Sequence, residues 1–143
     1  MADRKHLQML ARGVKTWNAW RKRSSAQPDL SRAVLVDREL RGINLSEANL
    51  ERAILRGTTL SRANLAGARL RRADLRTASL RRARLDGADL TGAILRHASL
   101  AETSVEDAIF EGCEIYGIAV WNLRGKPRMQ ANLVIRASPR EPS

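Results

Sequence analysis

Large apolar residues recur at every fifth position of the chain from residue 30 to residue 115. Fifteen consecutive leucines, Leu30 to Leu100, are followed in the same register by Val105, Phe110 and Ile115. Two positions before most of them lies a small residue, which is alanine in twelve units. A period of five fits neither an α-helix, which repeats near 3.6 residues, nor a β-strand, which repeats at about two. The pattern predicts a chain that turns a corner once per unit, with two residues directed inward and three outward.

Stacked turns of this kind form a solenoid whose coils pair their backbone N–H and C=O groups at roughly 4.8 Å. Individual units such as Ala48-Asn49-Leu50-Glu51-Arg52 and Ala73-Asp74-Leu75-Arg76-Thr77 resemble the A-(D/N)-L-x-x repeat of the bacterial pentapeptide-repeat family. That resemblance implies an all-β solenoid, a right-handed quadrilateral β-helix with four units per coil. We expect about four coils, roughly 20 Å tall.

Three segments are expected: an N-terminal capping helix and linker (1–27), the repeats (28–117), and a C-terminal cap and tail (118–143). Asp3 is expected to cap a helix that runs to about Arg23. The apolar side of this helix holds Leu7, Leu10, Ala11, Val14 and Trp17. We expect that side to cover the open end of the first coil, since an open β edge must be covered. The alternative is a basic amphipathic helix lying on a membrane surface.

Several units depart from the pattern. Arg38 occupies a small inward position, so we expect the chain to bulge there or Arg38 to face the cap, with regular coils from Leu40. Thr58 and Thr103 replace inward alanines and are expected to hydrogen-bond locally. Phe110 is expected to fill a widened last coil, after which the chain leaves the repeat at Tyr116.

The ends of the chain carry a second resemblance. Trp17-Asn18-Ala19-Trp20, the segment from Tyr116 to Trp121, and the segment from Gln130 to Ile135 are similar to a module found ahead of Toll/interleukin-receptor-like domains. No such domain follows here, so we expect its effector activity to be absent.

The formal net charge is +11, and the chain holds 22 arginines against 4 lysines. With four units per coil, residues twenty apart stack in columns. Eight arginines form three columns and are the candidate binding residues: Arg32, Arg52 and Arg72; Arg56, Arg76 and Arg96; Arg62 and Arg82. Arginine favours bidentate contacts with carboxylate and phosphate. The same bias toward arginine is also what a GC-rich genome produces on an unspecialised, solvated surface.

The sequence offers no catalytic constellation, metal-ligand cluster or phosphate-binding glycine loop, so we expect neither an enzyme nor a cofactor or metal. Its two histidines are His6 and His97. The single Cys113 excludes an intramolecular disulfide and is expected to be buried and inert. No run of eighteen apolar residues predicts a membrane span, and charges interrupt any signal peptide. A cytoplasmic protein is expected.

Three functions fit these features. The first is a binding or scaffold module that presents an arginine-rich face to an acidic protein partner. The second is a sequence-independent nucleic-acid binder that uses the same arginines. The third, implied by the family, is protection of DNA gyrase by imitating DNA, and the charge of +11 argues against it. The outward column of Val34, Ile54 and Ile94 leaves a homodimer open.

Overall fold

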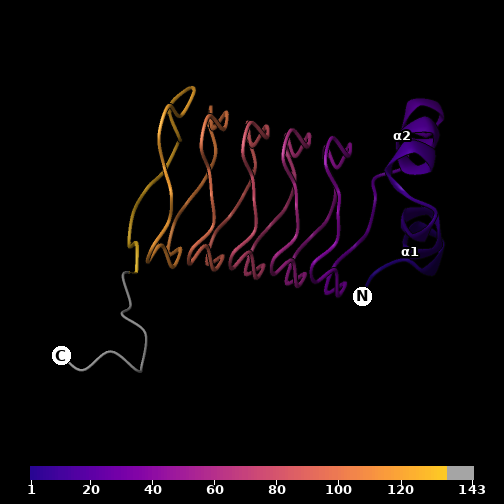
Figure 1. Ribbon diagram of the computed structural model, residues 1–143, viewed down its shortest axis with the longest axis horizontal. Helices are drawn as coiled ribbons and strands as arrows, with labels where there is room; N and C mark the ends of the chain where they lie inside the picture. Colours follow the sequence, from indigo (N-terminus) through magenta and orange to yellow (C-terminus); the bar gives the residue numbers. More distant parts are fainter. Residues whose placement is uncertain (135–143) are drawn as a thin grey trace.

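The computed structural model describes residues 1–134, which form two short helices followed by a solenoid (Figure 1). The helices are α1 (Arg4–Ala11) and α2 (Val14–Arg23). The expected single helix is therefore wrong: it is interrupted at Gly13, whose φ of 101° favours glycine. The capping role of Asp3 is confirmed, because its side chain accepts hydrogen bonds from the N–H groups of Lys5 and His6.

The solenoid repeats every twenty residues. Isolated parallel β-bridges join residues twenty apart in an unbroken register, from the pair Asp29 and Asn49 to the pair Glu114 and Val134. Each coil therefore contains four five-residue units. Residues 29 to 134 make slightly more than five coils, not the expected four.

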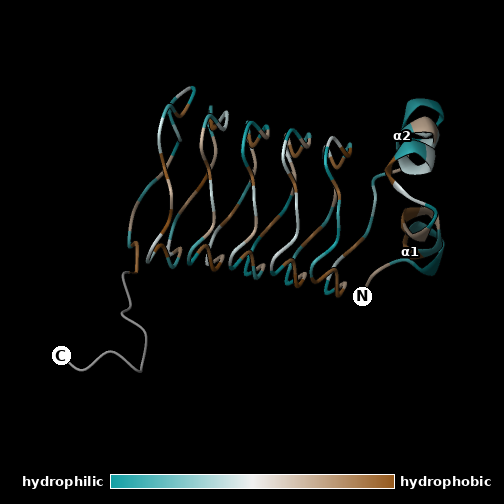
Figure 2. Cartoon of the chain, in the orientation of Figure 1, coloured by the Kyte–Doolittle hydropathy of each residue, from teal (hydrophilic) through white to brown (hydrophobic). Residues whose placement is uncertain are grey.

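The two apolar columns fill the interior of the coils. Every leucine from Leu30 to Leu100 is at most 5% exposed, and the twelve inward alanines are buried beside them. In Figure 2 the hydrophobic segments recur at matching places in successive coils. The sequence pattern thus predicts the core correctly.

Each corner is a tight turn. The N–H of the small residue donates to the carbonyl of the preceding large residue, as from Ala33 to Leu30 at 3.1 Å. Within each turn, the residue two positions after the leucine has a positive φ, which defines a type II turn. Glycine occupies this position in several units, yet Thr77 adopts a φ of 58° there despite its β-branched side chain.

Where Asp or Asn precedes a leucine of the repeat, its side chain has a structural role of its own. In six units its side-chain oxygen accepts the N–H two residues later, as in Asn64 to Ala66 at 3.1 Å and Asp89 to Thr91 at 3.0 Å. This N–H donates to no backbone carbonyl of a neighbouring coil, and the Asx turn gives it an acceptor within its own unit. The second letter of the repeat is therefore explained by backbone hydrogen bonding.

The helices cover the N-terminal edge of the first coil, as expected. Trp17 is fully buried, and its Nε1 donates to the carbonyl of Asn44 at 2.7 Å. Asn18 exchanges two hydrogen bonds with this edge, accepting from Asn44 N–H and donating to the Gly42 carbonyl. Arg21 donates to the carbonyl of Ser46 at 2.7 Å. These side chains from α2 satisfy backbone groups that a preceding coil would otherwise pair.

The irregular units differ from expectation. The register passes through Arg38 without a bulge, the bridges on both sides are regular, and its side chain is exposed at the N-terminal edge. Regular coils begin at Asp29, not near Leu40. The hydroxyls of Thr58 and Thr103 are not bonded locally: they donate to the carbonyls of Leu35 and Leu80, twenty-three residues earlier.

The chain also continues in register after Tyr116. Bridges at Ala119, Arg124, Met129 and Val134 extend the solenoid beyond the expected boundary between residues 117 and 118. Phe110 therefore does not close the last coil. At the large inward positions that follow, leucine is replaced by Val120, Gly125 and Gln130, so the period is not apparent in the sequence. Ile135, the last residue of the segment that begins at Gln130, lies outside the described residues.

Candidate binding surface at the arginine corners

The three predicted arginine columns lie at three successive corners of the solenoid. Each column stacks at the twenty-residue register, and two outward strand columns separate the corners. The first strand column contains Ile54, Asp74 and Ile94, and the second contains Thr59, Ser79 and Ser99. The arginines therefore do not form one continuous face, and each corner has its own electrostatic surroundings.

The column of Arg56, Arg76 and Arg96 is neutralised by acidic neighbours. Arg76 forms a bidentate pair with Asp74, with nitrogen–oxygen distances of 2.8 and 2.6 Å, and Arg56 approaches the same carboxylate at 3.5 Å. Arg96 pairs with Glu114 at 3.4 Å. Burial opposes ionisation of Asp74, but the hydrogen bonds and charges of these arginines outweigh it and lower the pKa of Asp74.

These ion pairs predict a loss of stability in acid. A lowered pKa of Asp74 means that folding favours its ionised form, so its contribution is present above the unfolded value near 3.8 and is lost as the pH falls through the folded value. We expect the melting temperature, followed by circular dichroism, to fall between about pH 5 and about pH 3.

A test variant and a matched control measure how much Asp74 contributes to this acid transition. D74N is expected to lower the melting temperature at neutral pH and to flatten the acid transition. D107N is the control, since Asp107 is exposed and makes no ion pair within residues 1–134. Equal effects of the two variants would contradict a role for the Asp74 pairs.

The column of Arg32, Arg52 and Arg72 is exposed and makes no ion pair in the described part of the chain. Arg32 and Arg52 line a shallow hollow of about 330 Å³, which they share with Glu51. This corner is basic, but a carboxylate already lies in its hollow.

The corner of Arg62 and Arg82 differs, because it borders a groove of about 470 Å³ without an acidic residue in its lining. We call this the arginine–hydroxyl groove. It is lined by four arginines and three hydroxyl residues: Arg41, Arg62, Arg81, Arg82, Thr59, Ser61 and Ser79. The hydroxyls of Ser61 and Ser79, which both belong to this lining, lie 2.9 Å apart and share a hydrogen bond.

Acidic residues lie at both ends of the arginine–hydroxyl groove. Glu39 approaches Arg41 at 3.8 Å, and Glu102 contacts Arg82 at 2.9 Å and Arg81 at 3.6 Å. The Arg82 hydrogen bond is the main cause that lowers the pKa of Glu102. Arg62 has no ion pair within residues 1–134 and is the arginine most available to a ligand.

Sequence reasoning found Arg62 and Arg82 but missed the other members of the groove. Arg41, Ser61 and Arg81 form one column at the neighbouring turn position, and Thr59 and Ser79 form the adjoining strand column. The twenty-residue register predicts these neighbouring columns, because it places residues twenty apart side by side in successive coils.

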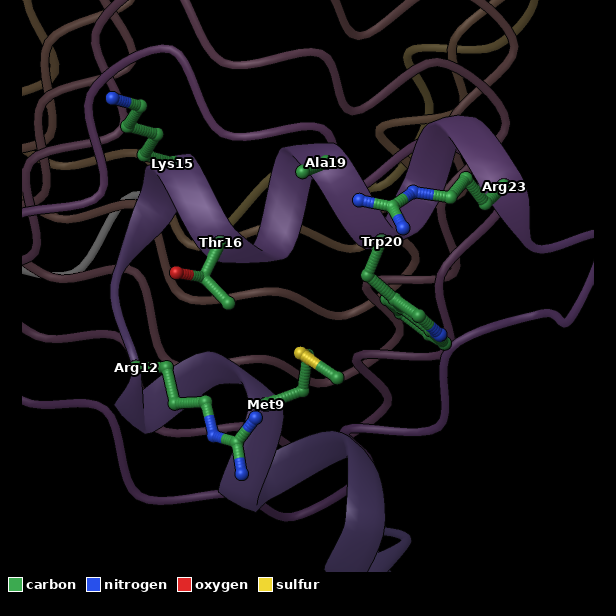
Figure 3. A pocket seen from close by; sticks show the side chains of 7 residues that line it. All are labelled: Met9, Arg12, Lys15, Thr16, Ala19, Trp20 and Arg23. Atoms are coloured by element: carbon green, nitrogen blue, oxygen red, sulfur yellow. The ribbon is translucent and has the colours of Figure 1, made fainter.

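A second cavity, of about 460 Å³, lies between α1 and α2 (Figure 3). Met9, Ala19 and Trp20 contribute its apolar lining, and Arg12, Lys15 and Arg23 surround it. The Trp20 ring also packs against the rings of His6 and Trp17, with centroids 5.2 and 5.0 Å apart. Trp20 therefore lines this cavity and also contacts the buried Trp17.

Cys113 and His97 lie in different surroundings. No group of three or more His, Cys, Asp or Glu that could hold a metal occurs within residues 1–134. Cys113 is fully buried, as predicted, and burial raises the pKa of its thiol to about 12. His97 lies exposed at a corner, with its ring against Tyr116. None of the helices in the described part is long and apolar enough to cross a bilayer.

Coils of four five-residue units, with leucines inside and Asx turns outside, define a β-solenoid repeat protein. The chain belongs to the pentapeptide repeat family, whose model, "Pentapeptide repeats (8 copies)", matches residues 29–65, 39–76 and 78–115.

Two solved structures illustrate the similarity. The pentapeptide repeat protein Rfr23 from the cyanobacterium Cyanothece 51142 is 37% identical over 72% of this chain and 68% of its own, with a TM-score of 0.53. The pentapeptide repeat protein alr5209 from Nostoc is 31% identical over 82% of this chain and 96% of its own, with a TM-score of 0.46. A comparison with curated proteins gave no significant match.

Proposed function

We propose that this chain is a non-catalytic binding module that holds an acidic protein partner in the arginine–hydroxyl groove. The observation that carries the proposal is a hollow lined by four arginines and by no carboxylate, in which Arg62 makes no ion pair within residues 1–134. The coils that hold these groups are fixed by a continuous hydrogen-bond ladder and a fully buried core. A rigid surface loses little conformational freedom on binding, which favours affinity.

A second candidate is sequence-independent binding of nucleic acid through phosphates. The guanidinium groups and hydroxyls of the groove suit phosphate as well as carboxylate. Its lining contains no aromatic side chain on which a single-stranded base would stack. Protection of gyrase by DNA mimicry is not proposed, since it requires a negative surface and the net charge is +11.

The proposal is tested by fluorescence anisotropy with labelled polyglutamate and labelled duplex DNA across a salt series. The test variant is R62E/R82E, and the matched control is R52E/R72E. All four arginines occupy the same turn position, with φ between 56° and 59°, and each pair stacks twenty residues apart. The variants therefore change charge equally in the same backbone conformation.

We expect polyglutamate binding to weaken by more than about tenfold in R62E/R82E and by less than about threefold in R52E/R72E at moderate salt. Equal losses would contradict the groove as the site and indicate general attraction to a basic protein. Tighter binding of duplex DNA, with a steep loss as salt rises, would favour the second candidate.

A further inference from the structure

The lining of the arginine–hydroxyl groove combines two kinds of donor. Attraction of carboxylates needs only positive charge, which the guanidinium groups supply. Thr59, Ser61 and Ser79 share the lining with the arginines and add uncharged donors. One of the Ser61 and Ser79 hydroxyls donates to the other, so one of this pair is left to donate to a ligand. Simple attraction to an acidic partner does not use these hydroxyls.

We propose that the groove is a binding site for phosphate groups on a short phosphorylated segment of the partner. The inference rests on the proposed function and names the chemistry of the ligand. A phosphate carries close to two negative charges and three strong acceptor oxygens, whereas a carboxylate carries one charge and two oxygens. Guanidinium forks engage two oxygens in a plane, and a hydroxyl of the lining can donate to the third.

The spacing of the donors sets the length of the ligand. Arg41, Arg62 and Arg81 come from three successive coils, so they span about 10 Å along the solenoid at roughly 4.8 Å per coil. An extended peptide rises about 3.3 Å per residue, so two phosphoserines separated by one residue lie about 7 Å apart. Two phosphates at that spacing fit within the reach of the three arginines.

The acidic ends of the groove favour a short ligand over a continuous polyanion. Glu39 and Glu102 lie at opposite ends, beside the arginines of the first and third coils. A nucleic-acid backbone that followed the groove would carry its next phosphates toward these carboxylates, which repel like charge. A phosphorylated peptide ends before them or continues with neutral residues.

The test compares three fluorescein-labelled ligands by anisotropy at physiological salt. One is a peptide with two phosphoserines separated by one residue, the second carries glutamates at the same positions, and the third is a short duplex DNA. The proteins are the intact chain, R62Q, S61A/S79A and the control R72Q. Arg72 shares the turn position of Arg62 and a similar φ but lies at another corner. Melting temperatures confirm that every variant is folded.

We expect the phosphopeptide to bind at least about tenfold more tightly than the glutamate peptide. R62Q is expected to lose about tenfold in phosphopeptide affinity and R72Q less than about twofold. S61A/S79A is expected to reduce the preference for phosphate while retaining the glutamate peptide.

Three outcomes would overturn the inference. Equal affinity for both peptides, weakened by R62Q, would retain the acidic-partner function but exclude phosphate selectivity. Tighter binding of the duplex than of the phosphopeptide would assign the groove to nucleic acid. Equal losses in R62Q and R72Q would place the phosphopeptide outside the groove and contradict the proposed function as well.

Discussion

Replacing Trp17 with alanine is expected to lower the free energy of unfolding by about 3–5 kcal/mol. The indole is fully buried between α2 and the first coil, and its Nε1 donates to the Asn44 carbonyl at 2.7 Å. The variant removes a large apolar side chain and leaves a carbonyl at the sheet edge without its partner. Urea unfolding followed by circular dichroism measures the change.

Trp121 supplies the control for this prediction. It is 52% exposed in the last coil, so W121A is expected to change the unfolding free energy by less than about 1 kcal/mol. Equal destabilisation by the two tryptophan variants would contradict the conclusion that the contact between Trp17 and the edge of the first coil stabilises the fold.

Replacing Ala78 with arginine is expected to abolish folding of the solenoid. Ala78 is 1% exposed in the middle coils, and it belongs to the column that begins with Arg38 and Thr58. Burying an unpaired guanidinium costs several kcal/mol or more, which is comparable with the total stability of a domain. Far-UV circular dichroism and size-exclusion chromatography measure the outcome.

The same column contains the controls for Ala78. A78T is expected to fold, because its hydroxyl can donate to the Leu55 carbonyl in the way that Thr58 donates to Leu35. R38A is expected to change stability by less than about 1 kcal/mol, since Arg38 is exposed. A folded A78R with an unchanged melting temperature would contradict the inward placement of this column.

The interior of the solenoid could be predicted because one residue type recurs at one period. An uninterrupted register assigns the leucines and alanines of the two columns to the inside, and the backbone bonds between coils then follow. The last coil could not be read in this way. Its inward positions include Ile118, Val120 and Leu123, which are only partly covered and so tolerate varied residues.

The cap and the groove depended on contacts that a linear pattern does not encode. Asn18 and Arg21 are polar residues on a helix, and their bonds to the coil edge exist only after α2 docks. Similarly, the columns of Arg56 and Arg62 look alike in the sequence. Asp74 pairs with Arg56 and Arg76 in the first column, whereas Arg62 borders a hollow whose lining contains no acidic residue.

The most direct test of the binding proposal is nuclear magnetic resonance of the arginine Nε–Hε groups during titration with the doubly phosphorylated peptide. The largest shifts are expected at Arg41, Arg62, Arg81 and Arg82, which line the groove. Arg32, Arg52 and Arg72 are expected to remain nearly unchanged, although they are also exposed. Shifts of similar size across both sets would contradict a defined site and leave only a basic surface.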